Sequence, residues 1–132
     1  MTAPGEETGA VLDLQVQPGL TMSSVRRALT AALADLGEDH LYDVLLVVTE
    51  LVSNVLDHTP GGGWLRVLRR QAPCVVTIEV DDESTGEPVR GRSRLGEHRG
   101  RGIVVVENIS LEWGIRPRRD GKTVFALVSC AG

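Results

Sequence analysis

The sequence predicts an α+β fold in which helices cover one face of a mixed, mostly antiparallel sheet. Two amphipathic helical segments lie close together in the first half, and alternating strand segments fill most of the second half. Separate runs of helices and strands are typical of this class rather than of regularly alternating α/β folds. The 132 residues, 42% of them hydrophobic and 24% charged, suit one globular domain with a single core.

The first 60 residues predict a tail, one strand and two helices. Residues 1–10 are expected to form a short disordered tail, and Val11–Gln17 alternates apolar and polar residues as a half-buried strand does. From about Thr21 to Leu36, apolar residues recur every three or four positions, which predicts an amphipathic helix. A second helix, apolar along one continuous face, is predicted from about Glu38 to His58.

The second half predicts strands, a loop and one short helix. Residues 83–99 are polar and lack periodicity, and a loop of that length in a compact domain is usually functional. A short helix is expected to begin at Gly102 and to continue through residue 108. Four segments alternate as strands do: Trp64–Arg70, Val75–Val80, Leu111–Arg116 and Thr123–Ser129.

Composition narrows the range of partners. The net charge of −4 argues against a general nucleic-acid binder, and no apolar run approaches the about 20 residues that span a bilayer. The first ten residues also lack the features of a signal peptide. We therefore expect a cytoplasmic protein with no direct nucleic-acid or membrane partner. Cys74 and Cys130 form no CxxC motif, and in that compartment we expect reduced core residues rather than a disulfide.

The segment ELVSNVLDH in the second helix carries polar residues at helical spacing. Glu50, Asn54 and His58 are spaced i, i+4 and i+8, so they lie near one another on one side of the helix. An amide oxygen such as that of Asn54 is a suitable ligand for Mg²⁺, and Glu50 could deprotonate a nucleophile. Taken alone, the stripe is more often a solvated helix face.

Two acidic residues end the strand IEVDD. Strand alternation puts Asp82 on the same face as Val80 and Ile78, so we choose Asp82 over Asp81 as a candidate ligand for an adenine amino group. An acidic turn at the strand end is an equally good interpretation.

Two further segments are weaker candidates. EHRGRGI places Gly100 and Gly102 around Arg101 before an apolar helix, where free backbone N–H groups can hold phosphate. A plain loop-to-helix junction would have the same sequence. In GKT, Lys122 or the Thr123 hydroxyl could reach a nucleotide, although a hairpin turn is the simpler interpretation.

In this order, the four segments resemble the motif set of the histidine-kinase-like (GHKL) ATPases. ExxxNxxxH at residues 50–58 resembles the N box, and DxS at 82–84 resembles the first glycine box, with Ser84 where glycine is usual. GRGI at 100–103 resembles the second glycine box, and GKT at 121–123 the final threonine motif. Trp113-Gly114 and the short loop resemble the branch of anti-sigma-factor serine kinases.

The resemblance implies a two-layer α/β sandwich of the Bergerat type over residues 11–130, with ATP between the helix layer and the loop at 83–99 as a lid. It implies Asn54 on Mg²⁺, Glu50 as the catalytic base and Asp82 on adenine. Further nucleotide contacts that it implies come from His58, Ser84, Gly100, Arg101, Gly102, Ile103 and Thr123.

For function, the resemblance implies an ATP-dependent serine/threonine kinase that acts as an anti-sigma factor. Its partners would be a sigma factor and an antagonist protein that it phosphorylates on serine, and the resemblance also allows a homodimer. The alternative is a nucleotide-binding regulatory module that sequesters a partner without kinase activity. Glu50 favours the kinase, because a pure binder has less need of a base.

Overall fold

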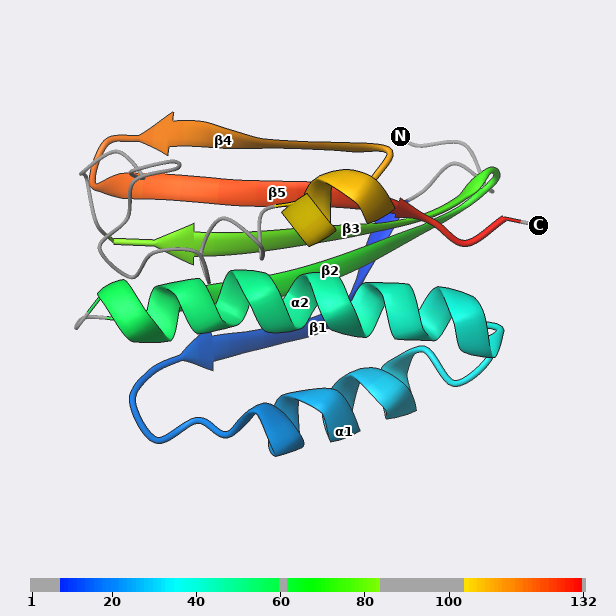
Figure 1. Ribbon diagram of the computed structural model, residues 1–132, viewed down its shortest axis with the longest axis horizontal. Coiled ribbons are helices and arrows are strands. Elements are labelled where there is room, and N and C mark those ends of the chain that lie inside the picture. Colours follow the sequence, from blue (N-terminus) through cyan, green and yellow to red (C-terminus); the bar gives the residue numbers. More distant parts are fainter. Residues whose placement is uncertain (1–7, 60–61, 84–103, 132) are drawn as a thin grey trace.

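Helices cover one face of a five-stranded sheet in the computed structural model, which describes residues 8–59, 62–83 and 104–131 (Figure 1). The strands are ordered β1-β2-β3-β5-β4, and each neighbouring pair is antiparallel. The elements are β1 Thr8–Val16, α1 Met22–Ala32, α2 Glu38–His58, β2 Gly63–Gln71, β3 Cys74–Asp82, β4 Glu112–Arg118 and β5 Gly121–Ser129. The predicted α+β class is confirmed, but the described strands form an antiparallel sheet rather than a mixed one.

Two boundaries differ from the prediction by more than two residues. β1 begins at Thr8, opposite Arg70 of β2, so residues 8–10 belong to the sheet and not to the expected tail. α1 ends at Ala32, although the apolar spacing continues to Leu36. The spacing continues because Leu33 is fully buried and Leu36 contacts the core from the turn that follows α1.

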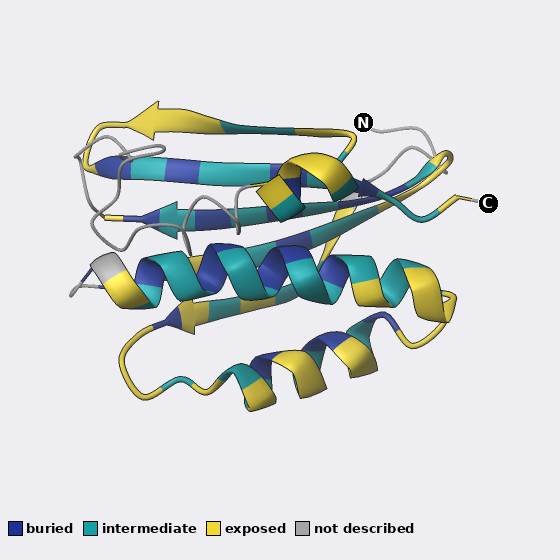
Figure 2. Ribbon diagram, viewed as in Figure 1, coloured by how far each residue is buried: buried dark blue, intermediate teal, exposed yellow. Residues whose placement is uncertain are grey.

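The core lies between α2 and the central strands. Val76, Ile78 and Val80 of β3 are completely buried on the helix-facing side, as are Val48 and Val52 of α2 to within 1%. Figure 2 shows this burial along α2 and the middle of the sheet, whereas the outer side of α1 and much of β4 are exposed. No helix in the described part of the chain is both long and apolar enough to cross a membrane.

A disulfide joins Cys74, the first residue of β3, to Cys130, which follows β5. The two Cα atoms are 5.0 Å apart, and the backbone N–H of Cys130 donates to the carbonyl oxygen of Cys74 over 3.0 Å. The expectation of two reduced cysteines is therefore wrong in this structure. Pairing of β3 with β5 brings together residues that are 56 positions apart in the sequence, which no local spacing reveals.

Candidate functional site

Asp82 is a buried carboxylate at the end of β3, on the sheet face that the helices cover. Only 7% of the residue is exposed. The Thr59 hydroxyl donates to its Oδ1 over 2.7 Å, and the Lys122 ammonium donates to its Oδ2 over 3.0 Å. Thr59 directly follows α2, and Lys122 lies opposite Asp82 in β5. Donors from two other elements therefore hold the carboxylate, as a buried charge requires.

Asp81 has different surroundings, because adjacent residues of a strand point to opposite faces. The Arg66 guanidinium binds both of its oxygens at 3.0 Å, the Thr123 hydroxyl donates to Oδ1 over 2.7 Å, and Arg118 lies 3.2 Å away. Burial raises the pKa of Asp81, but the bonds from Arg66 and Thr123 and the charge of Arg118 outweigh it, so the pKa falls below its usual value. Asp81 is thus a structural carboxylate on the uncovered face, the face of the sheet that points away from the helices.

The same uncovered face carries a network of charges that sequence reasoning missed. Glu79 accepts from Arg66 over 3.1 Å and from Arg116 over 3.0 Å, and Arg116 stacks 4.8 Å from the ring centre of Phe125. Such cross-strand pairs contribute modestly to the stability of a sheet. The signal for this network was a pair of charged residues two positions apart in each of two strands, Glu79 and Asp81 in β3 and Arg116 and Arg118 in β4.

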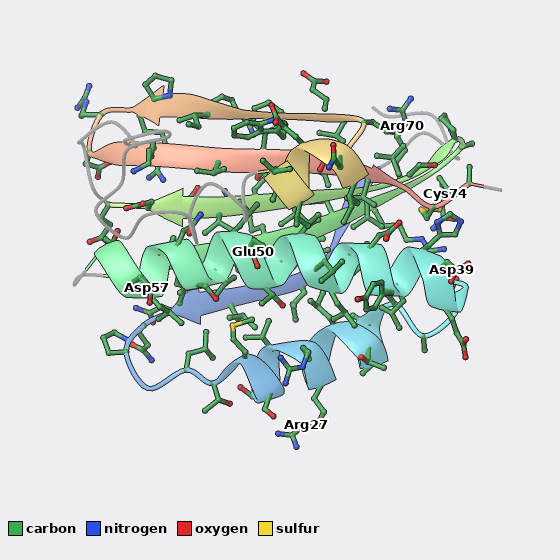
Figure 3. The ribbon with its side chains drawn as sticks, viewed as in Figure 1. Arg27, Asp39, Glu50, Asp57, Arg70 and Cys74 are labelled. Carbon is green, nitrogen blue, oxygen red and sulfur yellow. A yellow bond between two sulfur atoms is a disulfide. The ribbon has the colours of Figure 1, made fainter. Side chains whose placement is uncertain are left out.

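Glu50 and Asn54 lie on α2, beside the face of the helix that is buried against the sheet. Both residues are half-exposed, and within residues 8–59, 62–83 and 104–131 no hydrogen bond or ion pair reaches either side chain. Each step of four residues rotates by only about 40° around a helix, so Glu50 and Asn54 lie on the same side of α2. Figure 3 shows Glu50 near the middle of α2 and Asp57 near its end.

The direction of α2 connects these polar residues with Asp82. The helix ends at His58, and the next residue is the Thr59 that donates to Asp82. With a rise of about 1.5 Å per residue, Asn54 lies about 7.5 Å and Glu50 about 13.5 Å from Thr59 along the axis. The polar side of α2 that carries Asn54 and Glu50 therefore leads away from Thr59, which contacts Asp82.

Several expected site residues lie outside the described residues: Ser84, Gly100, Arg101, Gly102 and Ile103. The same holds for the side chain of His58 and for nearly all of the expected lid. The body of the short predicted helix is present at residues 104–109, where Val106 is completely buried.

The structure places the side chain of Thr123 on the face of the sheet opposite to Asp82. Its hydroxyl donates to Asp81 on the uncovered face, so it does not lie beside Asp82. Lys122, one residue earlier, takes the place on the helix-facing side, because directly opposite residues of an antiparallel pair share a face. The register between β3 and β5, which decides between the two residues, is a long-range property of the sheet.

Trp113 and Gly114 have a structural explanation. Trp113 packs against the core from the helix-facing side of β4. A Cβ atom at Gly114 would lie 3.0 Å from two ring carbons of Phe125, so glycine leaves room for that ring. The pair therefore meets packing needs of this sheet, whatever it indicates about the branch of the family.

Comparison with known families decides the identity of the fold. Residues 15–127 match the histidine kinase-like ATPase domain. The chain belongs to this family. A comparison of this ATPase domain with curated proteins gives no match.

The side-chain oxygens of Asp82 and Asn54 fit the ligand that this family binds, ATP with Mg²⁺. Domains of this family bind ATP, typically with Mg²⁺. A buried carboxylate such as Asp82 accepts from an amino group, and the amide oxygen of Asn54 is a hard ligand of the kind that Mg²⁺ prefers. The chain is thus an ATP-binding domain of the kinase and ATPase type.

Proposed function

We propose that the ATPase domain binds ATP with Mg²⁺, phosphorylates an antagonist protein on serine and holds a sigma factor inactive. One observation carries the catalytic part of the proposal. Asp82 is buried and held by protein donors, whereas Glu50 and Asn54, along the same helix-facing layer, have no bond to another described side chain. The first arrangement suits recognition of a base, and the second suits a metal and a reacting group.

Asp82 is the proposed acceptor for the adenine amino group. An ionised carboxylate offers about four acceptor positions, and Thr59 and Lys122 are two of the donors that Asp82 has in this structure. These two bonds also fix the orientation of the carboxylate before any nucleotide arrives. A fixed acceptor costs little further ordering when the ligand binds.

Glu50 is the proposed catalytic base, and Asn54 the proposed ligand of Mg²⁺. ATP with Mg²⁺ supplies the phosphoryl group and offsets the negative charge on its oxygens. Glu50 would accept the proton of the serine hydroxyl as the serine oxygen bonds to the γ-phosphorus. The bond from that phosphorus to the bridging oxygen breaks, and ADP leaves. The half-exposed position of Glu50 on α2 allows a protein substrate to approach it.

The proposal is tested with labelled ATP and a panel of purified antagonist-type proteins. Glu50→Ala should keep most of the ATP affinity but lose phosphate transfer by about 10²-fold or more, as expected for a general base. Asn54→Ala should lose both, because it removes the metal ligand. Asp57→Ala is the matched control, since Asp57 is an exposed acidic residue of the same helix. It should transfer phosphate as the wild type does.

Two results would contradict the proposal. Phosphate transfer by Glu50→Ala at the wild-type rate would remove Glu50 as the base. A wild-type protein that binds a sigma factor but phosphorylates no antagonist would instead support the alternative function, a nucleotide-binding module that sequesters its partner.

A further inference from the structure

The Lys122–Asp82 pair places a hydrogen-bond donor beside an acceptor on the helix-facing side of the sheet. We infer that Lys122 is a base-specificity residue of the ATPase domain: its ammonium donates to ring nitrogen N1 of adenine while Asp82 accepts from the 6-amino group. The inference rests on the proposed nucleotide site at Asp82 and goes beyond it by assigning the second contact to the base.

The placement of the three side chains supports this assignment. The Thr59 hydroxyl donates to Oδ1 of Asp82, and Nζ of Lys122 lies 3.0 Å from the other oxygen, Oδ2. The Lys122 ammonium is therefore next to Oδ2. The 6-amino group and N1 of adenine are both bonded to carbon C6, and one is a donor and the other an acceptor. The Asp82 carboxylate, an acceptor, can therefore pair with the 6-amino group, and the Lys122 ammonium, a donor, can pair with N1.

Burial of Lys122 and Asp82 strengthens their ability to discriminate between bases. The side chains of Lys122 and Asp82 are 13% and 10% exposed, so water competes little for their bonds. An ammonium has three N–H donors, and a bond to Asp82 is compatible with another to a base. The threonine that follows Lys122 donates on the opposite face of the sheet, to Asp81. Lys122 is therefore the side chain of the GKT segment that lies beside Asp82.

The same pair disfavours guanine. In the orientation that suits adenine, guanine would present its O6 acceptor to the Asp82 carboxylate and its N1–H donor to the Lys122 ammonium. Both contacts would be mismatched, and leaving buried polar groups unpaired is the strongest way for a site to reject a ligand. Lys122 thus adds a repulsive contact against 6-oxopurines to the attractive contact with adenine.

The test compares ATP with 1-deaza-ATP, in which a C–H replaces N1, by calorimetry on the wild type and on Lys122→Met. The wild type should bind 1-deaza-ATP about 10-fold or more weakly, because a hydrogen bond to a charged group is lost. Lys122→Met keeps the length of the stem and removes the donor, so the two ligands should differ by less than about 2-fold. Arg119→Met, in the exposed turn before β5, should keep the wild-type difference.

The outcomes are separable. Equal affinity of the wild type for ATP and 1-deaza-ATP would overturn the role of Lys122 even if ATP binding itself is normal, and this comparison needs no variant that folds. A wild-type loss that persists in Lys122→Met would place the N1 contact on another residue and would also overturn it. Absence of ATP binding by the wild type would contradict the proposed nucleotide site as well.

Discussion

The hydroxyl of Thr59 donates to Oδ1 of Asp82 over 2.7 Å, and this buried bond joins the end of α2 to the end of β3. Its importance lies in what α2 carries. Glu50 and Asn54 are on that helix, and Asp82 is on the sheet. The bond therefore sets the position of the proposed catalytic and metal-binding residues relative to the proposed adenine acceptor.

Thr59→Val should destabilise the fold, because it leaves a buried carboxylate oxygen without this donor. We expect the free energy of unfolding to fall by about 1–3 kcal/mol, measured by urea denaturation. The control is Thr30→Val, since the Thr30 hydroxyl donates to the Arg26 carbonyl oxygen at an exposed position of α1. The Thr30 variant should lose much less. Equal decreases in the free energy of unfolding of the two variants would show that the buried Thr59–Asp82 bond stabilises the fold no more than the exposed Thr30 bond does.

Acid should weaken the fold partly through Asp81. Its pKa is lowered in the folded protein, so the unfolded chain, with a pKa of about 3.9, takes up the proton more readily. The contribution of Asp81 to stability is therefore present above about pH 4 and is lost as the pH falls through the lower, folded-state pKa. Asp81→Asn should unfold at a lower urea concentration than the wild type at pH 7. The difference between the two urea midpoints should become smaller toward pH 3. A difference that is constant with pH would contradict this assignment.

The disulfide should contribute substantially to stability, because it closes a long loop. For cysteines 56 positions apart, the chain-entropy argument gives about 4 kcal/mol, and measured values are commonly about 2–4 kcal/mol. The double variant Cys74→Ser with Cys130→Ser should therefore unfold at less urea than the oxidised wild type and should match the reduced wild type. Mass spectrometry after thiol alkylation checks the bond itself. A serine variant as stable as the oxidised wild type would contradict the expectation.

Local patterns predicted the helices, the strands and the carboxylate at the end of β3. The period of the apolar residues located α2, and strand alternation separated Asp82 from Asp81, because both depend on neighbouring residues along the chain. The pairing of Cys74 with Cys130 and the face of Thr123 depend on which strands pair and in which register. Those are long-range properties that neighbouring residues along the chain do not reveal, and for this reason the expectation of two reduced cysteines was wrong.

The partner of Asp82 illustrates the same limit. Thr59 follows α2 in the sequence and had no motif to single it out, yet it contacts a residue 23 positions away. The residues alone offered Lys122 or Thr123, the resemblance favoured Thr123, and only the register of β3 with β5 places Lys122 opposite Asp82. Residues that orient a functional group are harder to predict than the group itself, because their role exists only in the folded arrangement.

The most direct test of the account is calorimetry with ATP and Mg²⁺ on two variants of neighbouring residues. Asp82→Asn changes the carboxylate on the helix-facing side, and Asp81→Asn changes the carboxylate on the uncovered face. We predict that Asp82→Asn weakens ATP binding by about 10-fold or more, whereas folded Asp81→Asn binds ATP as the wild type does. Equal ATP affinity of Asp82→Asn and the wild type, or a larger loss in Asp81→Asn, would contradict the placement of the nucleotide site.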